Sequence, residues 1–90
     1  MVGLNLRELT AQEKKKYEVD IGLKVVGRVT GNLREETNMC EDFIITAING
    51  KPVASLEEFE DMIDGEKGVM LEGFYPDGTP DHYFTKSLAG

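Results

Sequence analysis

The sequence has few of the residue types on which enzymes and metal sites depend. Its 90 residues include one cysteine, Cys40, and one histidine, His82. A single cysteine excludes an internal disulfide, and no spacing of cysteine and histidine supports a zinc site. No motif places the hydroxyl group of Ser55 or Ser87 beside the His82 imidazole, so a Ser-His-Asp triad is not expected. We therefore expect no catalytic residue, metal or cofactor in this chain.

Basic residues and long apolar runs are also scarce. Lys and Arg total 10 against 17 Asp and Glu, so the formal net charge is -7. This charge repels phosphate backbones and anionic lipid headgroups, so neither nucleic acid nor a membrane surface is an expected partner. No apolar run approaches the roughly 18–20 residues of a membrane helix, and residues 1–5 carry no export signal. We expect a cytosolic chain or a piece cut from a longer protein.

The composition that is present is typical of a small folded domain. Hydrophobic residues make up 40% and charged residues 30% of the 90 positions, as in soluble globular proteins. A chain of this length is near the lower limit for a core that is stable without disulfides or metals. The sequence predicts one domain over residues 1–90.

Three segments carry the signal of a helix start, an N-cap residue followed three positions later by Glu. They begin at Thr10, Asn32 and Ser55. In the third segment Leu56, Phe59 and Ile63 recur at helical spacing, which predicts a helix with one apolar face packed on a sheet. Lysines 14–16 fall at the end of the first helix, where cations complement the helix dipole.

Strand signals fill the intervals between these segments. Alternating or continuous apolar residues predict strands at residues 4–9, 23–29, 43–48, 69–75 and 83–88. The nearly continuous apolar run at 43–48 indicates burial on both faces, and the turn residues 76–79 join the last two strands in a hairpin. Five to six mainly antiparallel strands with two to three short helices predict an α+β fold, a partly open barrel or sandwich.

The most informative stretch is residues 43–53 (FIITAINGKPV), which runs directly into the capped helix 55–59 (SLEEF). An apolar strand breaks at Asn49-Gly50, the pair best suited to a tight turn with φ > 0, and resumes before the helix. This order resembles a PDZ domain. Residues 2–9 (VGLNLREL) and 22–26 (GLKVV) precede it in the order of a bacterial PDZ module, and the ending 73–79 (GFYPDGT) extends the resemblance over nearly the whole chain.

The resemblance is strongest to the C-terminal PDZ domains of Deg-type (high-temperature-requirement, HtrA) serine proteases. It implies a circularly permuted bacterial topology in which the carboxylate-binding loop comes first. It also implies that this chain is a fragment of a larger periplasmic protease and is itself a peptide-binding module without catalytic activity. The expected ligands are peptides or unfolded polypeptides with apolar C-termini, captured by β-strand addition. A further expected partner is the protease domain of the parent chain, and the isolated domain should be monomeric.

The family pattern also implies which residues contact the ligand, with Phe59 and Met62 mainly in the core. The implied peptide-binding residues are Val2, Gly3, Leu4, Asn5, Leu6, Arg7, Leu56, Phe59, Glu60 and Ile63. Successive N–H groups at residues 2–4 would converge on the ligand carboxylate, and the strand that follows would offer its free edge.

Two alternatives stay open on the sequence. One keeps the PDZ fold in a tail-specific or site-2 protease, and the other is a structural or oligomerisation module whose groove is filled by its own chain or a neighbouring subunit.

Where many relatives have glycine, this sequence has Asn38 and Asp42. Both residue types tolerate φ > 0, so positive φ is predicted at both positions.

Overall fold

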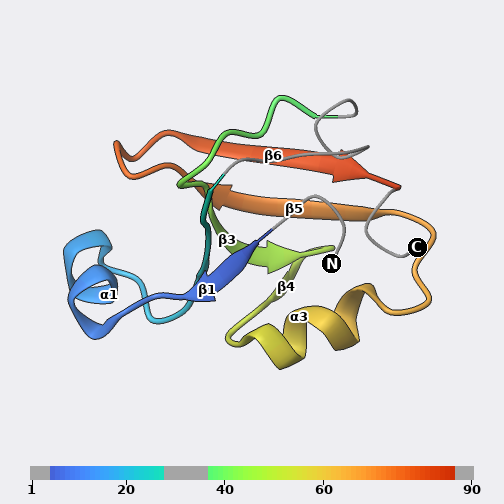
Figure 1. Ribbon diagram of the computed structural model, residues 1–90, viewed down its shortest axis with the longest axis horizontal. Helices are drawn as coiled ribbons and strands as arrows, with labels where there is room; N and C mark the ends of the chain where they lie inside the picture. The colour runs from blue at the N-terminus through green and yellow to red at the C-terminus, as the bar shows by residue number, and fades with distance from the viewer. Residues whose placement is uncertain (1–4, 28–36, 87–90) are drawn as a thin grey trace.

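The computed structural model describes residues 5–27 and 37–86 (Figure 1). In chain order its elements are β1 (Leu6–Glu8), α1 (Ala11–Tyr17), β2 (Leu23–Val25), β3 (Ile44–Ile48), β4 (Lys51–Pro52), α3 (Leu56–Ile63), β5 (Val69–Phe74) and β6 (Pro80–Thr85). Each predicted strand segment therefore contains a strand. The helix predicted to begin at Asn32 lies outside the described residues.

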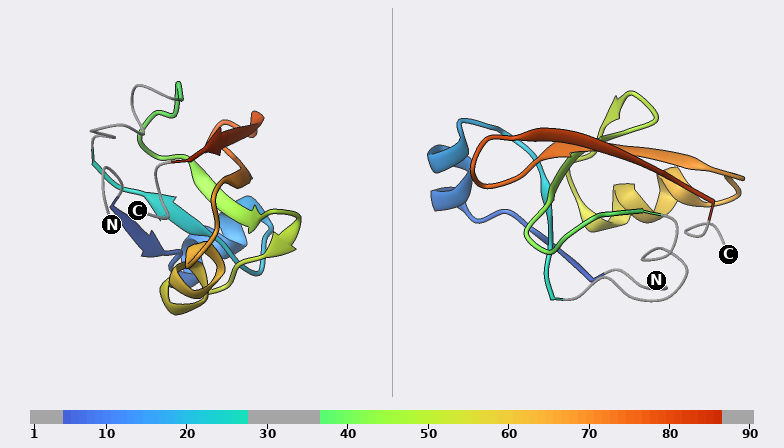
Figure 2. Two further views of the ribbon diagram at one scale, coloured as in Figure 1. Left: turned by 90° about the vertical axis from the view of Figure 1, so that its right-hand side faces the viewer. Right: turned by 90° about the horizontal axis from the view of Figure 1, so that it is seen from above.

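The described strands form one open, six-stranded sheet. Their order is β1-β2-β3-β5-β6, with β4 paired to β3, and every pair is antiparallel. The two ends of the sheet are therefore β1 and β6, which come from opposite ends of the chain. Figure 2 shows the twist of the sheet between these edges. The predicted α+β class with mainly antiparallel strands is confirmed, and the strands lie in a single sheet.

The hydrophobic core lies between the sheet and α3. Phe59 of α3 and Phe43, Ile45 and Leu71 of the sheet region are fully buried members of this core. Ile44 is also fully buried, although adjacent strand residues point to opposite faces. The strand is therefore buried on both faces at Ile44 and Ile45, as predicted, whereas Thr46 and Ala47 are only partly buried.

The second face of the sheet is covered near β2. The side chains of Leu9 and Ile44 are both buried and pack closely against Gly22. A Cβ atom placed at Gly22 would lie 2.8 Å from Leu9 and 2.9 Å from Ile44. On the same side of the molecule, Tyr17 at the end of α1 meets Phe74 of β5 edge-on, with ring centroids 5.7 Å apart. This smaller cluster attaches α1 to the sheet.

The turns follow the predicted backbone chemistry at all but one position. Asn49 and Gly50 have φ values of 52° and 81° and join β3 to β4, with Ile48 opposite Lys51, as a two-residue hairpin requires. Asp42 has the predicted positive φ, 74°. The same prediction for Asn38 is wrong, because the non-glycine residues with positive φ in the described chain are Glu18, Asp42 and Asn49.

Both described helices begin where the sequence predicts. Thr10 accepts from the Glu13 N–H at 3.2 Å and its own N–H donates to the Glu13 carboxylate at 3.0 Å, a complete capping box. At α3 the Ser55 hydroxyl accepts from the Glu58 N–H at 3.1 Å, but the Glu58 carboxylate accepts from the N–H of Ala54. The second box is therefore shifted by one residue on its return bond.

The predicted closing hairpin is present as β5 and β6. The Tyr75 N–H donates to the Thr79 carbonyl at 2.9 Å, and Gly78 has φ 92°. The Asp77 carboxylate accepts from the Thr79 N–H, which lowers the pKa of Asp77. A local Asx turn thus supports the positive φ that glycine permits.

Candidate functional site

The outer edge of β1 has no partner strand in the described part of the chain. β1 ends the sheet and pairs only with β2. The main chain of Asn5 and of Leu9 hydrogen-bonds to residues 22–26, over 2.8 Å and 3.3 Å respectively. Backbone groups alternate between the two edges of an antiparallel strand. Leu6 and Glu8 therefore direct their N–H and C=O groups to the open edge, where a further strand can pair.

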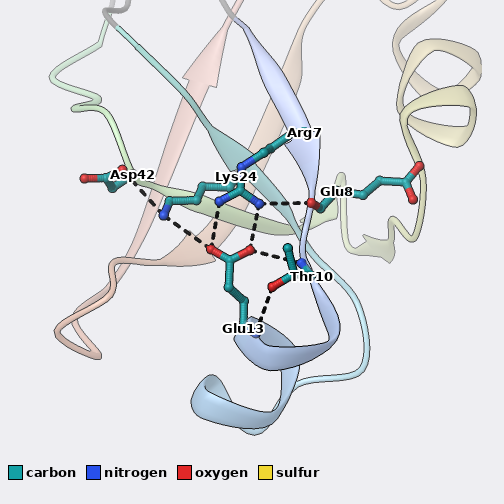
Figure 3. A network of polar contacts seen from close by, with 6 residues as sticks. All are labelled: Arg7, Glu8, Thr10, Glu13, Lys24 and Asp42. Carbon is teal, nitrogen blue, oxygen red and sulfur yellow. Dashed lines mark hydrogen bonds and ion pairs between the residues drawn. The ribbon is translucent and has the colours of Figure 1, made fainter.

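Helix α3 begins beside this edge. The N–H of Leu56, the first helical residue, donates to Oε2 of Glu8 at 3.4 Å. Figure 3 shows the Glu8 side chain extended toward α3. An acidic group is favourable at a helix N-terminus, where unpaired N–H groups and the helix dipole meet it. This contact joins two segments that are 48 residues apart in sequence.

The predicted ligand contacts on α3 separate into two rows. Phe59 and Ile63 are buried, at 0% and 6% exposure, and belong to the core. Leu56 is 38% exposed, and Glu60, one turn further along, is also exposed. Residues four positions apart share a helix face, so the accessible face of α3 carries Leu56 and Glu60.

The predicted contacts on the strand side are only partly described. Val2, Gly3 and Leu4, assigned to the carboxylate loop, lie outside the described residues. Asn5 is exposed, and Leu6 is half-buried and packs against the same core that α3 covers. Leu6 and α3 therefore lie on one face of the sheet.

Arg7 lies on the opposite face and is engaged by α1. Its two guanidinium nitrogens donate to the two Glu13 carboxylate oxygens at 2.6 and 2.8 Å (Figure 3). Glu13 also accepts from the N–H of Thr10 and from Nζ of Lys24, the latter at 3.4 Å. Lys24 lies 3.7 Å from the carboxylate of Asp42. This network fastens the start of α1 to β1 and β2.

The network changes the acidity of its members. The charge-assisted bonds from Arg7, with the Thr10 N–H, hold the pKa of Glu13 far below its ordinary value of 4.5. The hydrogen bonds to Glu13 raise the pKa of Arg7 above its ordinary value. Both ionised forms are therefore favoured in the folded state.

The depressed Glu13 pKa predicts a specific acid sensitivity. In the unfolded chain Glu13 takes up a proton near pH 4.5, whereas in the folded chain it stays ionised. Its contribution to the free energy of unfolding is therefore full above that pH and declines as the pH falls. For a partly solvated ion pair we expect about 1 kcal/mol of this loss between pH 6 and pH 3. Urea unfolding at both pH values should show that much less acid destabilisation in Glu13→Gln. An equal acid loss in the two proteins would contradict the assignment.

Two residues at this edge are missed by the sequence reasoning. Glu8 is the residue that contacts the start of α3, and Glu13 is the residue that holds Arg7. The capping box identifies Glu13 as a helix residue, but no local signal relates it to Arg7 across the strand-helix turn. The contact of Glu8 with Leu56 depends on the whole fold.

Two side chains considered above as members of a catalytic triad, Ser55 and His82, lie in the described part of the chain. The Ser55 hydroxyl caps α3, and His82 is exposed on β6. Within residues 5–27 and 37–86, no group of three or more His, Cys, Asp or Glu side chains is arranged to hold a metal ion. The helices of the same residues are too short and too polar to span a bilayer.

Comparison with known proteins agrees with this geometry. A family model described as a PDZ-like domain matches residues 1–65, which include β1, α3 and the open edge. A search of curated proteins found no match. The model covers well over half of the 90 residues, and PDZ domains are peptide-binding modules rather than catalysts. The chain therefore belongs to the PDZ-like domain family.

Proposed function

We propose that this domain captures C-terminal or extended polypeptide segments by β-strand addition at the open edge of β1. The observation that carries the proposal is the position of that edge: it is unpaired in the described chain and lies beside the start of α3. Leu6 offers a main-chain N–H and C=O, which bind any extended segment independently of its sequence, and Glu8 directs a second pair of main-chain groups to the same edge. By the family resemblance, Val2, Gly3 and Leu4 receive the terminal carboxylate through their N–H groups.

Selectivity in this proposal comes from side chains of the strand and the helix. Leu6 and Leu56 provide apolar surface for the side chain of the ligand's last residue, which favours an apolar terminus. Glu60, Glu8 and the net charge of -7 favour basic or neutral residues further upstream. A binding scan in which acidic peptides bind best would contradict this preference.

The expected affinity is modest. A few hydrogen bonds of about 1 kcal/mol each, one carboxylate contact and one buried side chain, less the cost of association, leave a small net free energy. We expect dissociation constants of roughly 1–100 μM, equivalent to about −8 to −5.5 kcal/mol.

The resemblance to Deg-type proteases supplies the proposed setting. The domain would recognise substrates for, or regulate, a serine protease domain elsewhere in the parent chain, in the periplasm. In that setting it would hold unfolded polypeptides by exposed termini and report its occupancy to the protease. The sequence of the parent chain tests this directly, because a His/Asp/Ser protease domain, a Ser/Lys dyad or a membrane-borne His-Glu-x-x-His motif would each distinguish the host.

An NMR titration with an apolar-ended peptide, in free-acid and amidated forms, tests the binding proposal. The free acid should shift the amides of residues 2–7 and 56–63, and amidation should weaken binding about tenfold because one charge-assisted contact is lost. Equal affinity for both forms would remove the carboxylate role. No saturable binding of either would favour the alternative of a self-occupied groove.

A pair of surface variants serves as the control for this titration. Leu56 and Phe84 are the two exposed large hydrophobic residues of the described chain, at 38% and 52% exposure. Leu56 lies at the proposed site, and Phe84 lies on β6 at the other edge of the sheet. Leu56→Ser should weaken peptide binding, whereas Phe84→Ser should leave it unchanged.

A further inference from the structure

We propose that the Arg7 guanidinium closes the open edge of β1 at the Glu8 carbonyl, so that an added strand donates a hydrogen bond to the Leu6 carbonyl but not to the Glu8 carbonyl. The inference rests on the proposed strand addition and concerns its length. It assigns Arg7 as a positioning residue that limits how far along the ligand the main-chain hydrogen bonds extend. Glu13 holds Arg7 in that position.

The main-chain pattern identifies the group that is closed. Glu8 is two residues from Leu6 and directs its carbonyl to the same open edge. Nη1 of Arg7 donates to this carbonyl at 3.2 Å (Figure 3). A ligand N–H that paired there would have to share the oxygen with a charged guanidinium, which is the stronger donor. The Glu8 carbonyl is therefore a poor second position for strand pairing.

The guanidinium is held where it makes this contact. Its bidentate pair with Glu13, at 2.6 and 2.8 Å, has the fork geometry that arginine forms with carboxylates. Glu13 is itself held by the Thr10 N–H at 3.0 Å and by Lys24 at 3.4 Å. The Arg7 side chain keeps 40% of its surface exposed, so a substitution can remove it without emptying the core.

The Glu8 side chain closes the same end of the edge from the other face. Its carboxylate accepts from the Leu56 N–H at 3.4 Å and brings the start of α3 against the strand. An approaching ligand therefore meets Arg7 at the Glu8 carbonyl and α3 at the Glu8 carboxylate. Both contacts lie at the position where an antiparallel ligand would continue toward its own N-terminus.

An amide-to-ester scan of a binding peptide tests the closure in the wild-type protein. Each ester removes one ligand N–H with little change of shape. One ester, at the residue opposite Leu6, should weaken binding about fivefold, the loss of one hydrogen bond. The ester two residues further toward the peptide N-terminus, opposite Glu8, should change binding less than about twofold. A similar loss at both positions would overturn the closure while supporting strand addition.

Arg7→Met tests the assigned residue, since methionine keeps much of the stem and removes the donors. In this variant the upstream ester should also become costly, by about threefold or more. Lys24→Met is the matched control: it removes another partner of Glu13 but leaves the Arg7 contact with Glu8, so the wild-type pattern should remain. If no ester affects binding at any position, strand addition itself is wrong and the inference falls with it. An Arg7→Met pattern identical to the wild type would overturn the role of Arg7.

Discussion

Replacing Gly73 by Ala is expected to destabilise the domain by at least about 3 kcal/mol, because the added methyl group meets backbone. Gly73 lies on β5 opposite Ile45, where the register between β3 and β5 shifts before Ala47. A Cβ built at Gly73 would come 1.7 Å from the carbonyl oxygen of Ile44. The β3–β5 pair at the centre of the sheet would have to separate to admit the methyl group. The loss is large because the total free energy of unfolding of a domain is only about 5–15 kcal/mol.

Urea unfolding of Gly73→Ala against Gly68→Ala measures this effect with a matched control. At Gly68 the added Cβ would also be close to a neighbour, 2.6 Å from Cζ of Phe84. That neighbour is the end of a side chain that is 52% exposed and can turn toward solvent. We expect Gly68→Ala to cost about 1 kcal/mol or less. Similar stabilities for the two variants would show that the β3–β5 pair adjusts more freely than its geometry indicates.

Phe59→Ala is expected to lower the free energy of unfolding by about 3–5 kcal/mol, the range for removing a buried aromatic side chain. Phe59 is fully buried and is the residue by which α3 enters the core, together with Ile63. The helix is eight residues long and has no basic residue in its last turn, so its stability depends on packing rather than on propensity. Loss of Phe59 should therefore also loosen the position of α3 beside β1.

Leu56→Ala on the same helix is the comparison for Phe59→Ala. Leu56 is 38% exposed, so its truncation should cost about 1 kcal/mol or less while still reducing peptide affinity in the proposed site. Thermal or urea unfolding gives the stabilities, and the peptide titration gives the affinities. A Phe59→Ala protein as stable as Leu56→Ala would contradict the assignment of Phe59 to the core.

Local sequence patterns predict the elements of this fold well. The Asn49-Gly50 turn, the capping residues Thr10 and Ser55 and the hairpin after Tyr75 all form as predicted. Each depends on backbone preferences and on side chains within four residues, and such interactions are the same in any fold. For this reason they can be inferred before any tertiary contact is known.

The errors have a physical cause as well. Asn38 tolerates positive φ as Asp42 does, but tolerance is not a requirement, and the path of residues 37–42 is set by its neighbours: the Cys40 N–H donates to the Tyr75 hydroxyl at 3.1 Å. At α3 the return bond of the capping box goes to Ala54 instead of Ser55. In both cases the local pattern permits the predicted conformation or hydrogen bond without requiring it.

The candidate site depends on contacts that no local pattern reports. Hydrophobic spacing is sufficient to place Phe59 and Ile63 on the core face of α3, and the strand signals place Leu6 on a strand. Only the assembled sheet leaves β1 at an edge, directs the carbonyl of Glu8 outward and brings Glu8 to Leu56, 48 residues away. Helix faces and turns follow from interactions over a few residues, whereas a free edge is a property of the completed strand order.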